Sequence, residues 1–202
     1  IQSYYMVFDN GTPDADSSDG DSAISGRSRL KKGTVDTDEH TISVPTFTLG
    51  RATTDTDSES LRSGWYYDFP VSKERQISSA EVFGDLIVFG SLIPGSSAAA
   101  GTCAASGGSG NEYAINLLDG NGTYRVSTVG ILGEPLLMEL SNIEYTKSDS
   151  TGKRTKTVSA RAIQQGSGGL STGGSNGTQV QTFTVGRLNW RQINNYLDLK
   201  ND

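Results

Sequence analysis

The stretch that decides the fold is GDLIVFGSLIP, residues 84–94 of a 202-residue chain. A Gly-Asp turn leads into residues 86–93, which are apolar almost throughout. An apolar run of this length, bounded by glycine and proline, is typical of a strand that is covered on both faces. We therefore predict that this strand lies in the middle of the core.

Segments upstream of this stretch also have strand character. Residues 4–8 and GWYYDFP (64–70) are rich in aromatic side chains, and residues 41–49 alternate polar with apolar side chains. Alternation sends Trp65 and Tyr67 to one face and Tyr66 to the other, which favours core packing over a ligand platform. In residues 41–49 it places Ile42, Val44 and Phe47 near one buried layer, with Pro45 at an edge or bulge.

Downstream segments continue the pattern. Residues 112–117 and 122–126 flank Asp-Gly-Asn-Gly, which predicts a hairpin because Gly and Asn accept the positive φ of tight turns. We also predict short strands over residues 142–145, 157–163 and 178–185. Residues 135–140 fit either a short strand or a single helical turn.

Polar tracts separate these strands. Only 34% of the residues are hydrophobic, and 25 are glycine, so the apolar side chains must be concentrated in a few strands. We predict loops over about residues 10–40, 51–62, 95–111 and 164–177. The pattern indicates one all-β unit over residues 1–202, with antiparallel strands in a sandwich, barrel or propeller fragment, cut from a larger chain.

Composition narrows the chemistry. A net charge of −6 disfavours nucleic-acid binding by the whole surface, and no apolar run approaches the length of a transmembrane helix. The single cysteine, Cys103, excludes an intrachain disulfide and a thiolate zinc cage. The single histidine, His40, lies in a polar turn without nucleophile or metal-ligand spacing, and we interpret it as a surface histidine. We predict no catalytic, cofactor-binding or metal-binding residue.

Of all segments in the sequence, one acidic loop is the most similar to a metal-binding motif. Asp14, Asp16, Asp19 and Asp21 offer the oxygen ligands that calcium prefers. The spacing departs from D-x-D-x-D-G by one residue, and no glutamate follows at the twelfth loop position. A solvated loop is therefore favoured over a calcium site, and no cofactor is required.

Two other motif types have simpler explanations. Asn10, Asn121 and Asn176 each begin an Asn-Gly-Thr glycosylation sequon, but Asn-Gly is first of all turn chemistry. The glycine runs at 107–110 and 166–169 lack the Lys-Ser/Thr of a phosphate-binding loop. Neither motif assigns a function.

The order and spacing of several motifs resemble the C-terminal region of the PilY/PilC-type type IV pilus tip adhesins. The motifs are GWYYDFP (64–70), ERQIS (74–78), GDLIVFGSLIP (84–94), Cys103 before a Gly/Ser stretch, and EYAINL (112–117). QSYY (2–5) resembles the strand that precedes this region, and GRLNWRQ (186–192) resembles the closing motif of the family. The family's calcium loop lies in an upstream blade, and the loop containing Asp14 does not match it.

The resemblance implies the last blades of a β-propeller in a non-enzymatic protein exported through the bacterial periplasm to the pilus tip. It implies roles in pilus assembly, adhesion to host or abiotic surfaces, twitching motility and, in some members, DNA uptake. The expected partners are minor pilins and the rest of the protein's own chain. Two alternatives stay open: a purely structural propeller portion whose missing N-terminal domain does the binding, and, less favoured, a secreted hydrolase built around His40 or a carboxylate pair.

Overall fold

In the computed structural model, most of the described residues lie in β-strands. Its described residues are 1–8, 27–50, 61–95, 107–140, 143–147, 154–172 and 178–185. Apart from one 3-10 turn at Arg27–Arg29, the regular elements in these ranges are strands. The pairings are antiparallel except for two short parallel ones, β2 with β7 and β5 with β6. The predicted all-β, antiparallel class is confirmed.

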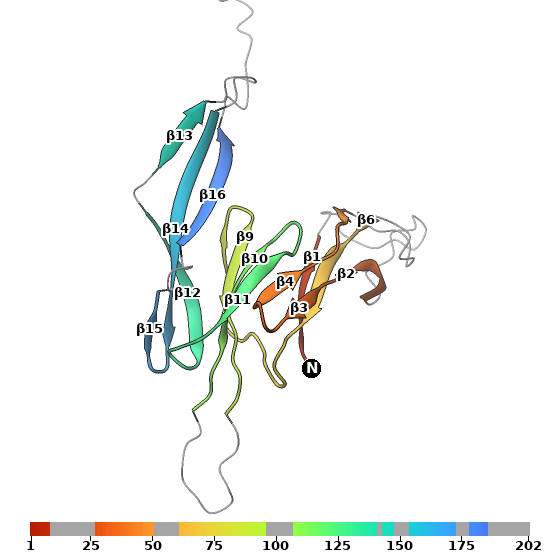
Figure 1. Cartoon of the computed structure of the whole chain (residues 1–202), viewed down its shortest axis with the longest axis vertical. Coiled ribbons are helices and arrows are strands. Elements are labelled where there is room, and N and C mark those ends of the chain that lie inside the picture. The colour runs from red at the N-terminus through yellow and green to blue at the C-terminus, as the bar shows by residue number, and fades with distance from the viewer. Residues whose placement is uncertain are drawn as a thin grey trace, which may run out of the picture.

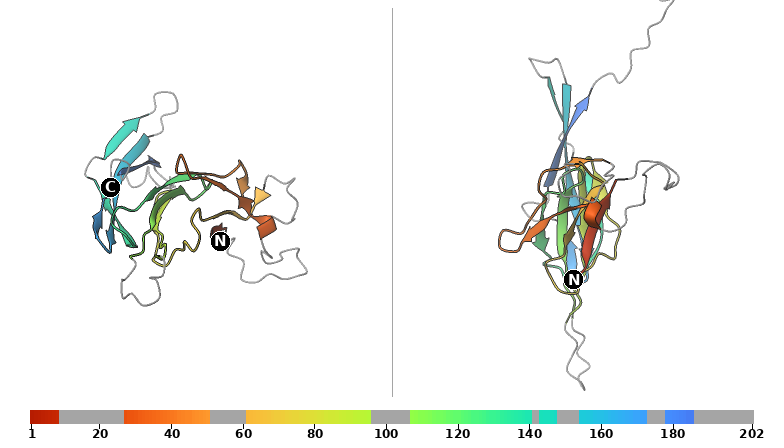
Figure 2. Two further views of the ribbon diagram at one scale, coloured as in Figure 1. Left: turned by 60° about the horizontal axis from the view of Figure 1, so that its bottom comes forward. Right: turned by 90° about the vertical axis from the view of Figure 1, so that its right-hand side faces the viewer.

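Three sheets stack as layers, and a short strand pair flanks them (Figure 1 and Figure 2). The first sheet has the order β1-β7-β2, the second β3-β4-β11-β10-β9-β8, and the third β12-β14-β13, with β15 and β16 also paired to β14. The strand bounds are β1 (Ser3–Val7), β2 (Lys31–Lys32), β3 (Thr34–Asp36), β4 (Thr41–Ser43), β5 (Thr48–Leu49), β6 (Leu61–Arg62), β7 (Gly64–Asp68), β8 (Glu81–Phe83), β9 (Leu86–Gly90), β10 (Asn111–Asn116), β11 (Gly122–Val126), β12 (Leu132–Glu139), β13 (Glu144–Lys147), β14 (Arg154–Gly166), β15 (Gly169–Ser171) and β16 (Thr178–Val185).

The main core lies between the first and second sheets. Strand β7 points Trp65 and Tyr67 inward, both fully buried, while Tyr66 faces the other way. The aromatic rings stack: the centroid of Phe89 lies 4.4 Å from that of Tyr4 and 4.8 Å from that of Tyr113. The core interpretation of the Trp-Tyr-Tyr run is confirmed. The buried members of this core are Ile42, Val44, Trp65, Tyr67, Phe69, Ile87, Phe89, Tyr113, Ile115 and Tyr124.

Strand β9 is covered on both faces, as its sequence predicts. Ile87 and Phe89 belong to the core against the first sheet. Val88 is buried on the opposite face, and a Cβ placed on Gly90 would lie 2.7 Å from the Leu132 side chain of the third sheet. The predicted hairpin is also present, because β10 pairs with β11 antiparallel.

Strand β14 extends beyond the other layers. Its thirteen residues pair with β12 at one end and with β13 at the other, along the same side. Figure 1 shows β13, the distal part of β14 and β16 rising above the second sheet. A small second cluster of Phe83, Val158 and Ala160, with Leu137 and Phe183 packed against it, joins this sheet to β8.

Four predicted boundaries need correction. Residues 27–36, expected within a loop, form the 3-10 turn, β2 and β3, because pairing with β7 and β4 supplies their backbone hydrogen bonds. Residues 61–62 form β6 rather than loop. The predicted loop at 95–111 ends earlier, since Ser109 bridges to Ile93 and β10 begins at Asn111.

The fourth correction concerns residues 164–172. They were predicted to be loop because of their Gly-Ser composition, yet β14 continues to Gly166 and turns directly into β15. Gln164 and Ser171 are buried opposite each other in this pair, so backbone pairing outweighs composition here. Residues 41–49 also divide into β4 and β5 around Pro45, and residues 135–140 prove to be part of a strand, β12.

Candidate functional site

Two predicted features lie outside the described residues: the acidic loop with Asp14, Asp16, Asp19 and Asp21, and Cys103. Asn10, Asn176 and the 186–192 motif also fall outside. Within the described residues, no group of three or more His, Cys, Asp or Glu side chains could hold a metal ion.

His40 lies exposed at the end of a tight turn, as predicted. Its backbone has a φ of 53°, and its carbonyl oxygen accepts a hydrogen bond from the Tyr124 N–H at 2.9 Å. The turn is fastened by Asp36, whose Oδ1 accepts from the N–H groups of Glu39 and Asp38, and these bonds lower the pKa of that carboxyl group. The imidazole centroid lies 4.9 Å from the Tyr124 ring.

Asn121 serves the turn chemistry that its sequence suggests. Its side-chain oxygen accepts from the Val44 N–H at 2.8 Å, and its own N–H donates to the Asp119 carboxylate. The adjacent Gly120 has a φ of +75°, and a Cβ there would lie 2.6 Å from Val44 and 2.9 Å from Trp65. The hairpin loop therefore requires glycine at this position and ties β4 to the β10–β11 pair.

A fully buried carboxylate, Glu74, lies in the connection between β7 and β8. Its Oε1 accepts hydrogen bonds from Ser91 Oγ at 2.6 Å, Asn111 Nδ2 at 2.8 Å and the Tyr113 hydroxyl at 2.6 Å. Its Oε2 accepts from the Val71 N–H at 3.2 Å. A buried charge is tolerated only when it is hydrogen-bonded in this way.

The Glu74 network affects the titration of its neighbours. Burial, followed by the nearby Glu74 charge and the hydrogen bond to it, raises the pKa of Tyr113 far above its ordinary value. Burial is likewise the main cause of the raised pKa of Tyr67, and it raises the pKa of Tyr4 to about 12. The tyrosines of this core stay neutral in any physiological range, so they act as packing and donor groups.

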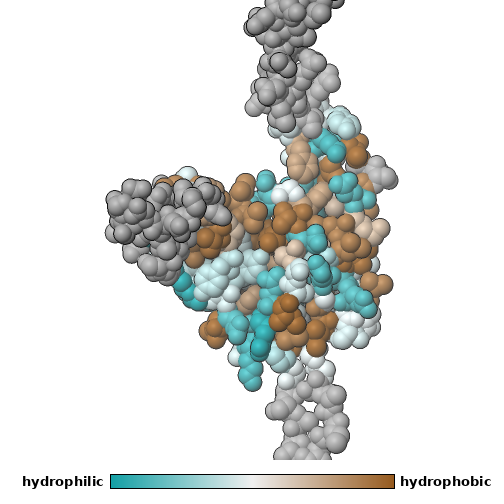
Figure 3. Space-filling view, turned by 180° about the vertical axis from the view of Figure 1, so that it is seen from behind, coloured by the Kyte–Doolittle hydropathy of each residue, from teal (hydrophilic) through white to brown (hydrophobic). Residues whose placement is uncertain are grey.

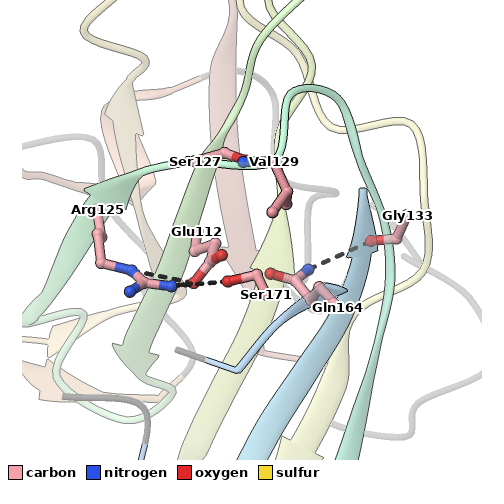
Figure 4. Close-up of polar contacts among 7 residues, drawn as sticks. All are labelled: Glu112, Arg125, Ser127, Val129, Gly133, Gln164 and Ser171. Atoms are coloured by element: carbon pink, nitrogen blue, oxygen red, sulfur yellow. Dashed lines mark hydrogen bonds and ion pairs between the residues drawn. The ribbon is translucent and has the colours of Figure 1, made fainter. Parts of the chain in front are cut away.

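A cleft of about 250 Å³ lies between the second and third sheets. The side chains of Glu112 and Arg125, opposite each other on β10 and β11, form an ion pair in which Arg125 Nε lies 3.1 Å from Glu112 Oε2. Arg125 Nη2 also donates to Ser171 Oγ at 2.8 Å, which links the two sheets (Figure 4). His40, Tyr124, Gln164 and Gln179 contribute to the lining.

The polar groups of this junction mostly satisfy one another. Gln164 Nε2 donates to the Gly133 carbonyl at 3.2 Å, and Ser127 Oγ accepts from the Val129 N–H at 3.1 Å (Figure 4). Glu112 Oε1 is buried without a hydrogen-bond partner. Among these described side chains, no nucleophile is paired with a base. Their contacts connect the second sheet to the third.

A cationic and aromatic cluster covers the outer face of the first sheet. The Arg27 guanidinium lies 4.8 Å from the Tyr66 ring centroid and 5.3 Å from that of Tyr5, and these two rings stack. Asp68 holds the cluster together: it accepts from Ser3 Oγ at 2.6 Å and lies 3.4 Å from Arg27 and 3.7 Å from Lys32. An open groove of about 590 Å³ runs beside it.

The sequence did not predict the three polar clusters, which are centred on Glu74, on the Glu112–Arg125 pair and on Asp68. The alternation along β10 does indicate that Glu112 faces away from the layer of Tyr113 and Ile115, because successive side chains point to opposite faces. The pairing of Glu112 with Arg125 depends on the hairpin register. Glu74 lies in the ERQIS motif, and no pattern in that motif indicates that its carboxylate is buried. Strand alternation carried the only usable signal for these sites.

Comparisons with known proteins leave the chain unassigned. No protein-family model, no curated protein and no solved structure matches it. Among the described residues, no helix is long and apolar enough to cross a membrane.

Proposed function

We propose that this chain is a non-enzymatic binding module of a type IV pilus tip protein of the PilY/PilC type. In this role it forms the C-terminal blades of a β-propeller, is exported through the periplasm to the cell surface, and contributes to pilus assembly, twitching motility and attachment. Its partners are minor pilins, the rest of its own chain, and a host or abiotic surface. DNA uptake is a further role in this class.

The observation that carries the proposal is that residues from separate motifs of the resemblance contact one another in the folded chain. Glu74, Ser91 and Tyr113 belong to three separate motifs of the resemblance, and the Ser91 and Tyr113 hydroxyls both donate to Glu74 in the core. The three motifs therefore lie in one packed unit, as the proposal requires.

The layered arrangement fits the propeller part of the proposal. Propeller blades are mainly antiparallel sheets that pack beside one another, and the three mainly antiparallel sheets of this chain are compatible with that arrangement. Loops projecting from such a rigid scaffold are the usual carriers of binding. The described surface offers mixed chemistry: Figure 3 shows hydrophobic side chains interrupted by hydrophilic ones.

A solid-phase assay with the purified chain tests the binding role. Cultured epithelial cells, polystyrene, double-stranded DNA and a purified minor-pilin complex serve as separate arms. We expect saturable binding to at least one cellular or abiotic surface. If the chain binds only the minor-pilin complex, or binds in none of the arms, the purely structural alternative is favoured.

The parent reading frame tests the assignment to the pilus. We expect it to encode a signal peptide and an N-terminal adhesive domain upstream of this chain. The hydrolase alternative is tested separately, by assaying hydrolytic activity of the wild-type chain and of the variants His40→Ala and Glu112→Gln. A hydrolytic activity that both variants lose, while their thermal melting is unchanged, would contradict the non-enzymatic role.

A further inference from the structure

Strand β16 is an edge strand with unusual length and regularity. Its eight residues, TQVQTFTV, pair one by one with β14 from Arg154↔Val185 to Arg161↔Thr178, without a bulge. No strand in the described part of the chain pairs with its other side. Its outer edge therefore presents a row of backbone groups without a described strand partner.

The residues that form this row follow from the pairing of β14. The Leu140 N–H donates to the Ser159 carbonyl, so Ser159 directs its backbone groups toward β12. Since alternate residues of a strand bond to opposite neighbours, Val158 and Ala160 bond toward β16. The backbone groups of their partners, Gln181 and Gln179, therefore point toward β14. The outward N–H and C=O groups then belong to the alternate residues Thr178, Val180, Thr182 and Thr184.

Five other edge strands in the described part of the chain carry features that hinder pairing. Strand β12 contains Pro135 and a register shift, and β13 is four residues long with a charge at each end, Glu144 and Lys147. Strands β3 and β8 have three residues each. Strand β1 is uncharged but only five residues long, and Arg27 covers its Tyr5 ring.

Strand β16 has none of these features. It contains no charged residue, no proline and no bulge, which are the devices that protect natural edge strands. On its inner face, Phe183 packs edge-on against Phe83 at a centroid distance of 6.3 Å. This contact and the continuous pairing with β14 hold the strand against the sheet.

The chemistry of the edge specifies its occupant. Only another extended strand can bond to four outward N–H and C=O pairs at strand spacing, which is the β-augmentation mode of recognition. The β-branched, uncharged residues of β16 favour an uncharged partner strand. A second folded copy fits less well, because each copy carries a net charge of −6 and two copies would repel each other.

We propose that the outer edge of β16, which has no strand partner among the described residues, binds an extended, uncharged segment of another protein as an added strand. The third sheet then gains a strand beside Thr178–Val185. This inference goes beyond the proposed pilus role and does not rest on it, because it concerns the backbone of the isolated chain.

Hydrogen exchange of the full chain with a peptide probe tests the inference. The probe is an acetylated, amidated and uncharged copy of residues 178–185 with two serines at each end for solubility. We expect it to slow amide exchange at Val180 and Thr182 by about tenfold or more at saturation. The same probe with proline at alternate positions cannot donate to the edge, and we expect it to leave exchange unchanged.

A pair of variants localises the effect. Val180→Pro removes one outward N–H but leaves the inward ladder intact, a position where an edge strand tolerates proline. We expect it to abolish the protection, whereas Val180→Thr keeps the donor and retains it. If Val180→Pro fails to fold by circular dichroism, Thr184→Lys adds an edge charge and serves as the blocking variant.

Two outcomes overturn the inference. The first is unchanged exchange of the wild-type chain at millimolar probe. The second is a wild-type dimer in sedimentation that the blocking variant dissociates, which would assign the edge to a second copy. Neither outcome bears on the solid-phase assay, so the failure of this inference and that of the pilus proposal are distinguishable.

Discussion

The middle of the molecule and the projecting end of the third sheet are built by opposite means. Around Glu74, strands β7, β9 and β10 bury aromatic rings, and a carboxylate collects donors from distant parts of the chain. At the projecting end, Tyr145 is 70% exposed and Val180 is 56% exposed, and backbone pairing with β14 is the main support. The comparison teaches that one chain can combine a core specified by side chains with an extension specified by its backbone.

Removing the buried Glu74 carboxylate should have the largest effect on stability, because it weakens the core that is specified by side chains. Glu74→Ala leaves Ser91, Asn111 and Tyr113 with buried donors that have lost their acceptor, together with a cavity. We expect a loss of about 3–5 kcal/mol in the free energy of unfolding, measured by denaturant titration. Glu39→Ala, at an exposed turn, is the control and should change stability by less than about 0.5 kcal/mol. A similar small change for Glu74→Ala would show that the network is not part of the stabilising core.

The hairpin loop at Gly120 should rank second. Gly120→Ala combines an unfavourable positive φ with a clash against Val44 and Trp65, so we expect a loss of about 1–3 kcal/mol in thermal or denaturant unfolding. Gly107→Ala is the matched control, because nothing lies within 4 Å of a Cβ there. Equal effects of the two substitutions would contradict the tight packing of the loop on the core.

Phe183 tests how far the projecting end depends on the body. Phe183→Ala removes the edge-on contact with Phe83, and we expect a loss of about 1–2 kcal/mol because the side chain is only partly buried. Hydrogen exchange should rise in β16 while the amides of β9 and β10 stay protected. Equal loosening of β9 would mean that the two regions unfold as one unit. Val180→Ala, which removes an exposed side chain, is the control.

The smallest effect should come from Asp68 and should depend on pH. The hydrogen bond from Ser3 is the main cause that lowers the pKa of this carboxyl group, and Arg27 and Lys32 add to it. A folded pKa below the unfolded value, which is about 3.9, gives stability that is present above that pH and is lost as the pH falls through the folded pKa. Asp68→Asn should therefore lower the melting temperature slightly at pH 7, and this difference should shrink as the pH falls below about 3.9. A constant difference across this range would contradict the electrostatic role.

The sequence predicted the parts of the fold that side-chain pattern controls. The apolar run gave β9 as a central strand, the Asp-Gly-Asn-Gly turn gave the β10–β11 hairpin, and alternation placed Trp65 and Tyr67 in the core. It did not predict β2 or β15, because Lys31, Lys32 and the Gly-Ser tract have the composition of loops. These strands form only because a neighbour provides backbone partners, which no local pattern reveals.

The candidate sites were less accessible to sequence reasoning. The buried Glu74 looked like one charge among many, and its donors lie 17, 37 and 39 residues away along the chain. The Glu112–Arg125 pair required the exact hairpin register. Composition alone gives neither the burial of a charge nor the register of a strand, so both appear only in three dimensions.

The distant donors of Glu74 also set an order of events as the chain is made. Until Asn111 and Tyr113 have emerged, the carboxylate has only water and nearby groups to satisfy it, and the cost of burying it opposes closure of the core. A nascent chain that ends before Asn111 should therefore remain open and accessible to proteases. Since contacts over long sequence separations form slowly, the completed chain should fold on the slower timescale of non-local β-proteins.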